Sequence, residues 1–122
     1  MKGARFDYQQ NEVVFRIFYP DSDTGFIDTR WGLCGVNAIY ACADAPYKVA
    51  LAKYVKEFEE IDDCTAYDFS FYCQRIGINE IAIFLNPEDR MAILVKIEEV
   101  TSGPRYGSDT TYAKVKFKAR SY

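Results

Sequence analysis

Five segments of the chain show the short apolar runs or alternating side chains that are typical of β-strands. They are Glu12–Tyr19, Asn37–Cys42, Ile81–Leu85, Met91–Val100 and Tyr112–Ser121. Between the first two, the composition of Asp21–Gly25 predicts a turn. The segment Trp31–Gly35 predicts a loop whose glycines let backbone segments approach closely. These segments therefore predict that the chain forms a β-sheet.

The last of these segments carries a row of basic side chains on alternate residues. Lys114, Lys116, Lys118 and Arg120 alternate with small and apolar residues, and this period of two predicts a half-buried antiparallel strand. The lysine row has two interpretations. It protects a sheet edge from aggregation, or it forms a phosphate-binding stripe.

Two other segments show helical spacing. Asp44 is expected to cap a helix that runs to about Ile61, because apolar side chains at 47, 51, 54, 55 and 58 share one face. A second, shorter helix is expected over Thr65–Ile76, where Thr65 and Asp68 have capping spacing and Gly77 ends the helix. The pattern predicts an α+β fold: a single domain over 1–122 with a split, mostly antiparallel sheet, one long helix and one short helix.

Composition and charge narrow the classes of protein. The chain has 122 residues, a net charge of −3 and a pI of about 5.0, so it has no overall basic field to attract nucleic acid or an anionic membrane. The N-terminus lacks the apolar run of a secretory signal. The sequence also has no run of about 18 apolar residues, the length needed to span a bilayer. We expect a cytoplasmic protein that binds neither nucleic acid nor membrane.

Cysteine and histidine contents limit the possible chemistry. Cys34, Cys42, Cys64 and Cys73 have no CxxC spacing and lie in apolar surroundings, which favours reduced, buried thiols over a disulfide and excludes a cysteine metal site. The chain has no histidine. Histidine-based nucleophilic catalysis and the usual zinc sites are therefore excluded, and no metal is expected.

One carboxylate stands directly before a strongly apolar run. Glu80 precedes IAIFL in the stretch GINEIAIFLNP. A glutamate in this place is either a solvated strand end or a group placed for chemistry.

The stretch NEIAIFLNPEDRMAILVKIE resembles the terminal strand pair of the ADP-ribosyltransferase fold, particularly its poly(ADP-ribose) polymerase branch. GVNAIYACADAPYKVALAKY resembles the strand and helix of that family that carry two tyrosines. The resemblance implies that Glu80 is the catalytic glutamate, that Tyr40 and Tyr54 stack on nicotinamide, and that Arg16 holds the diphosphate of NAD+. Core packing is the alternative role for the tyrosines, and a strand-surface position is the alternative for the arginine.

The segment Arg30-Trp31-Gly32, followed by IYA, also resembles the RES-type NAD-consuming branch, in which Arg30 would hold the diphosphate. These roles suit the reaction, since a carboxylate stabilises positive charge on the ribose and tyrosine faces hold a pyridinium. The resemblance implies a small mono-ADP-ribosyltransferase that uses NAD+ to modify a macromolecule, an activity that would suit a phage or mobile-element effector. The alternative is an inactive nucleotide- or protein-binding module, such as an inhibitor of a host defence system.

Overall fold

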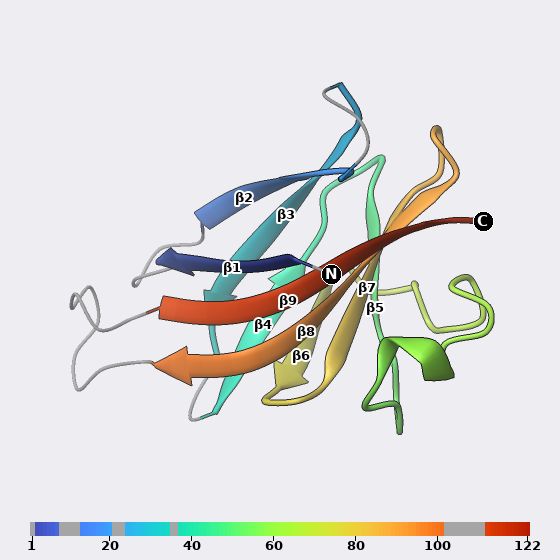
Figure 1. Ribbon diagram of the computed structural model, residues 1–122. Coiled ribbons are helices and arrows are strands. Elements are labelled where there is room, and N and C mark those ends of the chain that lie inside the picture. Colours follow the sequence, from blue (N-terminus) through green and yellow to red (C-terminus); the bar gives the residue numbers. More distant parts are fainter. Residues whose placement is uncertain (1, 8–12, 21–23, 35–36, 102–111) are drawn as a thin grey trace.

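The computed structural model describes residues 2–7, 13–20, 24–34, 37–101 and 112–122, and these form two antiparallel β-sheets (Figure 1). The five-stranded sheet has the order β1-β9-β8-β7-β5, and the four-stranded sheet has the order β2-β3-β4-β6. The strands are β1 (Lys2–Asp7), β2 (Val13–Phe18), β3 (Phe26–Leu33), β4 (Ala38–Cys42), β5 (Lys48–Leu51), β6 (Cys73–Gly77), β7 (Ile81–Asn86), β8 (Met91–Thr101) and β9 (Tyr112–Ser121). The expected α+β class is wrong, because the described chain is nearly all β.

The two sheets pack face to face around one large core. In Figure 1, β8 and β9 pass in front of β3 and β4, and side chains from both sheets fill the space between them. Trp31 lies at the centre of this core, fully buried, with its ring 5.1 Å from that of Phe6 and 5.5 Å from that of Phe84. Its indole donates to the hydroxyl of Thr29, and that hydroxyl donates to the carbonyl of Phe15. The buried polar atoms are thus satisfied.

The long helix expected from Asp44 to Ile61 does not form. Residues Lys48–Leu51 make β5 instead, and this strand pairs with the apolar strand β7. Tyr54 has a backbone φ of 63°, which a right-handed helix cannot include. Only Phe58–Glu60 is helical, as a single 3-10 turn. Pairing with β7 outweighs the local helical spacing, because a strand buried on both faces gains more than an isolated helix.

The second expected helix, over Thr65–Ile76, is also absent. Asp63 accepts hydrogen bonds from the backbone and hydroxyl of Thr65, and Asp68 accepts the same two bonds from Ser70. Such local bonds compete with a helix and favour turns. The end of the segment enters β6.

The five strands predicted from the sequence are confirmed within the described residues, as β2, β4, β7, β8 and β9. Glu12 and most of the expected turn 21–25 lie outside the described residues. Four strands were not predicted: β1, β3, β5 and β6. The error was largest for β3, because Ile27, Thr29 and Trp31 alternate with polar residues and face the core, although the segment from Trp31 was expected to be a loop.

The position of β9 tests one of the two interpretations of the lysine row. β9 lies between β1 and β8, but β1 pairs only with residues 112–117, whereas β8 pairs along the strand as far as Ser121. Protection of a sheet edge is therefore excluded for Lys114 and Lys116, and it still fits Lys118 and Arg120, which have no β1 partner among the described residues.

A second, smaller core lies on the outer face of the five-stranded sheet. The segment after β5, drawn in green in Figure 1, crosses this face and buries Val55, Phe58, Ile61 and Cys64 against β7 and β8. These four residues are spaced by three, the period of a 3-10 turn and not of an α-helix. β7 is consequently buried on both sides.

Cys42 and Cys73 form a disulfide between directly opposite residues of β4 and β6, whereas Cys34 and Cys64 are free. The prediction of four reduced thiols is wrong for this pair, and a disulfide is typical of oxidising compartments and not of the expected cytoplasm. No helix among the described residues has both the length and the apolar character needed to cross a membrane.

Candidate functional site

Glu80 lies in the turn that carries the chain from β6 in one sheet to β7 in the other. Its Oε1 accepts a hydrogen bond of 2.8 Å from the backbone N–H of Gly77. The Glu80 N–H in turn donates to the Gly77 carbonyl at 3.1 Å. Glu80 therefore closes this turn with its carboxylate and with its own backbone N–H, which is a structural role that neither sequence interpretation described.

The carboxylate of Glu80 also lies on the outer face of the four-stranded sheet. A Cβ on Gly77 would stand 2.9 Å from Glu80 Oε1, so the carboxylate occupies the side-chain position of Gly77. Arg75 is exposed, two residues earlier on β6, and points to the same face because side chains alternate along a strand. Arg75 is directly opposite Tyr40 on β4. Glu80 and Tyr40 thus share one face.

Of the other residues predicted to bind NAD+, only Arg30 lies near Tyr40 and Glu80. Arg30 lies on the same face, diagonally from Tyr40, whose partner on β3 is Gly32. Arg16 lies on β2, opposite Asp28 of β3. Asp28 is four residues away from Gly32, the partner of Tyr40, so Arg16 lies about 17 Å from Tyr40. Tyr54 follows β5 in the other sheet and is 96% exposed. The structure brings together Arg30, Tyr40 and Glu80, and it separates Arg16 and Tyr54 from them.

Both candidate arginines are already paired with carboxylates. Arg16 donates two hydrogen bonds to Asp28, at 2.7 and 3.1 Å, and its guanidinium stacks 3.8 Å above the ring of Phe26. The bond to Asp28 raises the pKa of Arg16. Arg30 donates two bonds to Asp44, at 3.1 and 3.2 Å. A diphosphate would have to displace a carboxylate from either guanidinium.

Tyr40 is exposed on β4, directly opposite Arg75 on β6. A hydrogen bond with Cys34 raises the pKa of its hydroxyl. The Arg75 side chain makes no ion pair or hydrogen bond within the described part of the chain, so its guanidinium is available to a ligand or partner.

Exposed apolar side chains continue across the same face. Val14 is 60% exposed, Phe18 48% and Tyr40 42%, and Phe18 makes an edge contact with Phe26 at 5.8 Å. We call this surface the four-stranded face. It comprises the outward side chains of Val14, Arg16, Phe18, Phe26, Asp28, Arg30, Tyr40 and Arg75.

The outer surface of the other sheet has a different composition. The strands β2, β3, β4 and β6 contain no lysine and no glutamate. In the other sheet, the two strands β8 and β9 together contain four lysines, at 96, 114, 116 and 118, and two glutamates, at 98 and 99. Arginine and aromatic residues are enriched in the centres of protein interfaces, and lysine and glutamate are depleted there. The two surfaces of one sandwich therefore differ in the way that interface and solvent surfaces differ.

Sequence reasoning did not identify Val14, Phe18 or Arg75 as functional. A signal was present for β2, where Val14, Arg16 and Phe18 alternate with the core residues Phe15 and Ile17. For Arg75 there was none, because its strand was expected to be a helix.

Comparison of the chain with protein-family models, with curated proteins and with solved structures finds no match.

Proposed function

We propose that this protein is a binding module that docks another protein on the four-stranded face. The observation that supports this function is the composition of that face: exposed apolar side chains lie between arginines, on strands that carry neither lysine nor glutamate. Contiguous exposed apolar surface on a folded domain commonly marks an interaction site.

The dimensions of the face suit the central part of an interface. From Phe26 to Leu33 it extends about 24 Å along β3, and across its four strands it extends about 14 Å. A standard interface buries about 800 Å² on each partner. The face would supply the centre of such an interface, and neighbouring loops would supply its rim.

The charges on the face indicate the chemistry of the partner. Asp28 and Asp44 pair with Arg16 and Arg30, while Arg75 beside Tyr40 has no carboxylate partner among the described residues. We expect a different protein whose apolar patch carries an acidic side chain that reaches Arg75. A second copy of this chain fits less well, because the carboxylates that it would bring are already bonded: Asp28 and Asp44 to arginines, and Glu80 to the Gly77 N–H.

The test uses site-specific crosslinking in the cells from which the sequence comes. A photoreactive amino acid at Tyr40 should capture a defined protein, and the same group at Lys118 on the opposite sheet should not. The captured protein is then purified and its affinity for the wild-type chain is measured. Tyr40→Ala and Arg75→Ala should each weaken binding by about tenfold or more, as interface hot spots do, while Lys118→Ala should leave it unchanged.

Three results would contradict the proposal. Crosslinks of equal yield from both positions would show non-specific contact, and capture of a second copy would replace a foreign partner with self-association. Release of nicotinamide from NAD+ by the purified chain with its target would favour the transferase hypothesis, with Arg30, Tyr40 and Glu80 as its residues.

A further inference from the structure

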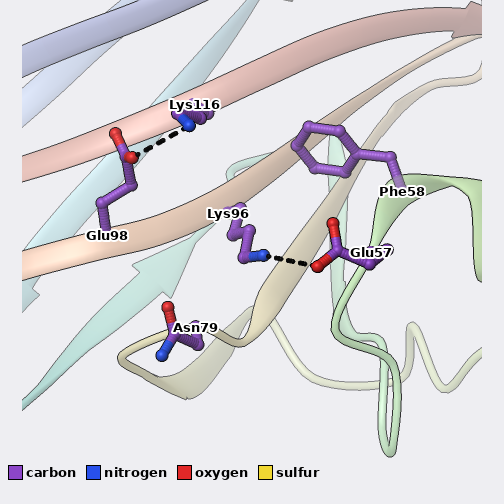
Figure 2. Close-up of a pocket in the computed structure, with 6 residues that line it drawn as sticks. All are labelled: Glu57, Phe58, Asn79, Lys96, Glu98 and Lys116. Carbon is purple, nitrogen blue, oxygen red and sulfur yellow. Dashed lines mark hydrogen bonds and ion pairs between the residues drawn. The ribbon is translucent and has the colours of Figure 1, made fainter.

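A hollow of about 320 Å³ lies on the opposite side of the molecule, on the outer face of the five-stranded sheet (Figure 2). Its lining comes from separate parts of the chain: the segment around the 3-10 turn, the turn before β7, and strands β8 and β9. The lining residues are Glu57, Phe58, Asn79, Lys96, Glu98 and Lys116. Its volume is at the lower end of the range for ligand sites.

The hollow contains two lysines in an arrangement that sheets generally avoid. Lys96 on β8 is directly opposite Lys116 on β9, and like charges in directly opposite positions destabilise a sheet. Each ammonium is paired with a different carboxylate: Lys96 Nζ lies 3.4 Å from Glu57, and Lys116 Nζ lies 3.4 Å from Glu98. Figure 2 shows that these two carboxylates lie on different sides of the lysine pair.

The walls of the hollow are held by contacts that do not involve the lysines. Asn79 has a φ of 69° and its N–H donates to the carbonyl of Ile97 at 2.7 Å, which fixes the turn against β8. On the other side, the guanidinium of Arg120 donates to the carbonyls of Phe58 and Ile61. These contacts hold the segment that carries Glu57 against the sheet. The site is therefore preorganised apart from its two exposed carboxylates.

We propose that this hollow binds a phosphate group, carried by a small molecule, between the ammonium groups of Lys96 and Lys116. A phosphate dianion can accept hydrogen bonds from both ammoniums at once and relieve their repulsion. The Asn79 amide can donate a further bond. When the site is empty, the carboxylates of Glu57 and Glu98 form ion pairs with the two lysines. When phosphate binds, these exposed carboxylates can turn outward. This proposal is independent of the protein-binding function, which uses the opposite face.

The test is a titration followed by backbone amide NMR at constant ionic strength, with inorganic phosphate, adenosine monophosphate and sodium chloride as separate probes. Saturable shifts confined to the amides around Asn79, Lys96 and Lys116 are expected with phosphate. Tighter binding of the nucleotide would identify a phosphate monoester as the ligand, and equal binding would identify free phosphate. Sodium chloride should shift these amides little and without saturation.

Some variants should weaken phosphate binding and one should strengthen it, and this difference distinguishes a specific site from attraction by general surface charge. Lys96→Gln and Lys116→Gln should each weaken phosphate binding by about tenfold, the scale of one charged hydrogen bond. Glu98→Gln should strengthen it, because it removes a competing carboxylate. Lys118→Gln, on the same face but outside the hollow, is the matched control and should change nothing. Equal losses in Lys118→Gln and Lys96→Gln, no gain in Glu98→Gln, or no saturable shifts would each overturn the proposal.

Discussion

Single side chains in the connecting turns determine how the chain changes sheets. Glu80 closes the turn between β6 and β7 by accepting the N–H of Gly77, and Asn79 beside it adopts a left-handed backbone conformation. Asn tolerates that conformation better than most residues. The position of Glu80 before the apolar strand is thus explained by the Gly77 N–H, which would have no acceptor without the Glu80 carboxylate.

Glu80→Ala should lower the free energy of unfolding by about 1–2 kcal/mol, because the Gly77 N–H is left without an acceptor in a partly buried turn. Glu80→Gln should lower it less, since its amide oxygen still accepts the bond. Chemical denaturation of the two variants provides the measurement, and Glu88→Ala, in an exposed turn, is the control. Equal losses in Gln and Ala would mean that the charge and not the acceptor matters.

Tyr54→Gly should leave the protein as stable as the wild type or stabilise it by up to about 1 kcal/mol. The side chain of Tyr54 is 96% exposed and its φ is 63°, a conformation that favours glycine. Tyr54→Ala keeps the unfavourable conformation and should show no such gain. Thermal unfolding of both variants compares them, and a clear loss of stability in Tyr54→Gly would show that the tyrosine makes contacts essential to the fold.

At the scale of elements, long-range pairing decided which segments became strands. The segment Lys48–Leu51 lies next to β7 and buries Val49 and Ala50, although its wider neighbourhood has helical spacing. β6 is held to β4 both by its ladder and by the Cys42–Cys73 disulfide. Neither partner strand is close in sequence to the element that it stabilises.

Thiol titration of the unfolded, unreduced protein should find two free thiols, those of Cys34 and Cys64. Because the disulfide closes a loop with a sequence separation of 31, the double variant Cys42→Ala/Cys73→Ala should lose about 3–4 kcal/mol in the chain-entropy model. Denaturation of the wild type with and without reductant provides an independent comparison. Four titratable thiols before reduction would contradict the disulfide.

At the scale of the whole molecule, one polar cluster ties the two sheets together. Tyr19, after β2, donates a hydrogen bond of 3.0 Å to Asp89 and accepts one of 3.1 Å from Asn86, at the end of β7. Asn86 also donates to the carbonyl of Phe26 at 3.4 Å. The cluster is the polar counterpart of the apolar core that the two sheets share.

Burial, followed by the bond to Asp89, raises the pKa of Tyr19 from 10.0 to about 12. The folded state therefore holds this proton more tightly than the unfolded state. Its contribution to stability should be complete below pH 10.0 and should be lost as the pH rises to about 12. Other tyrosines contribute in the same range, so the measurement is the difference in unfolding free energy between the wild type and Tyr19→Phe. That difference should shrink between these two pH values, and a constant difference would contradict the assignment.

The sequence by itself determined the strands whose signal is local. In β9 the strict alternation, and in β7 the uninterrupted apolar run, depend only on neighbouring residues, and both strands were predicted correctly. It also identified Arg30, Tyr40 and Glu80 as notable residues, which the structure places on one face. The tertiary structure alone decided that 48–51 is a strand, that Trp31 is central to the core, and that Lys114 and Lys116 of β9 lie inside a sheet. These outcomes depend on which strands become neighbours, because burial and hydrogen bonding between distant segments outweigh local spacing.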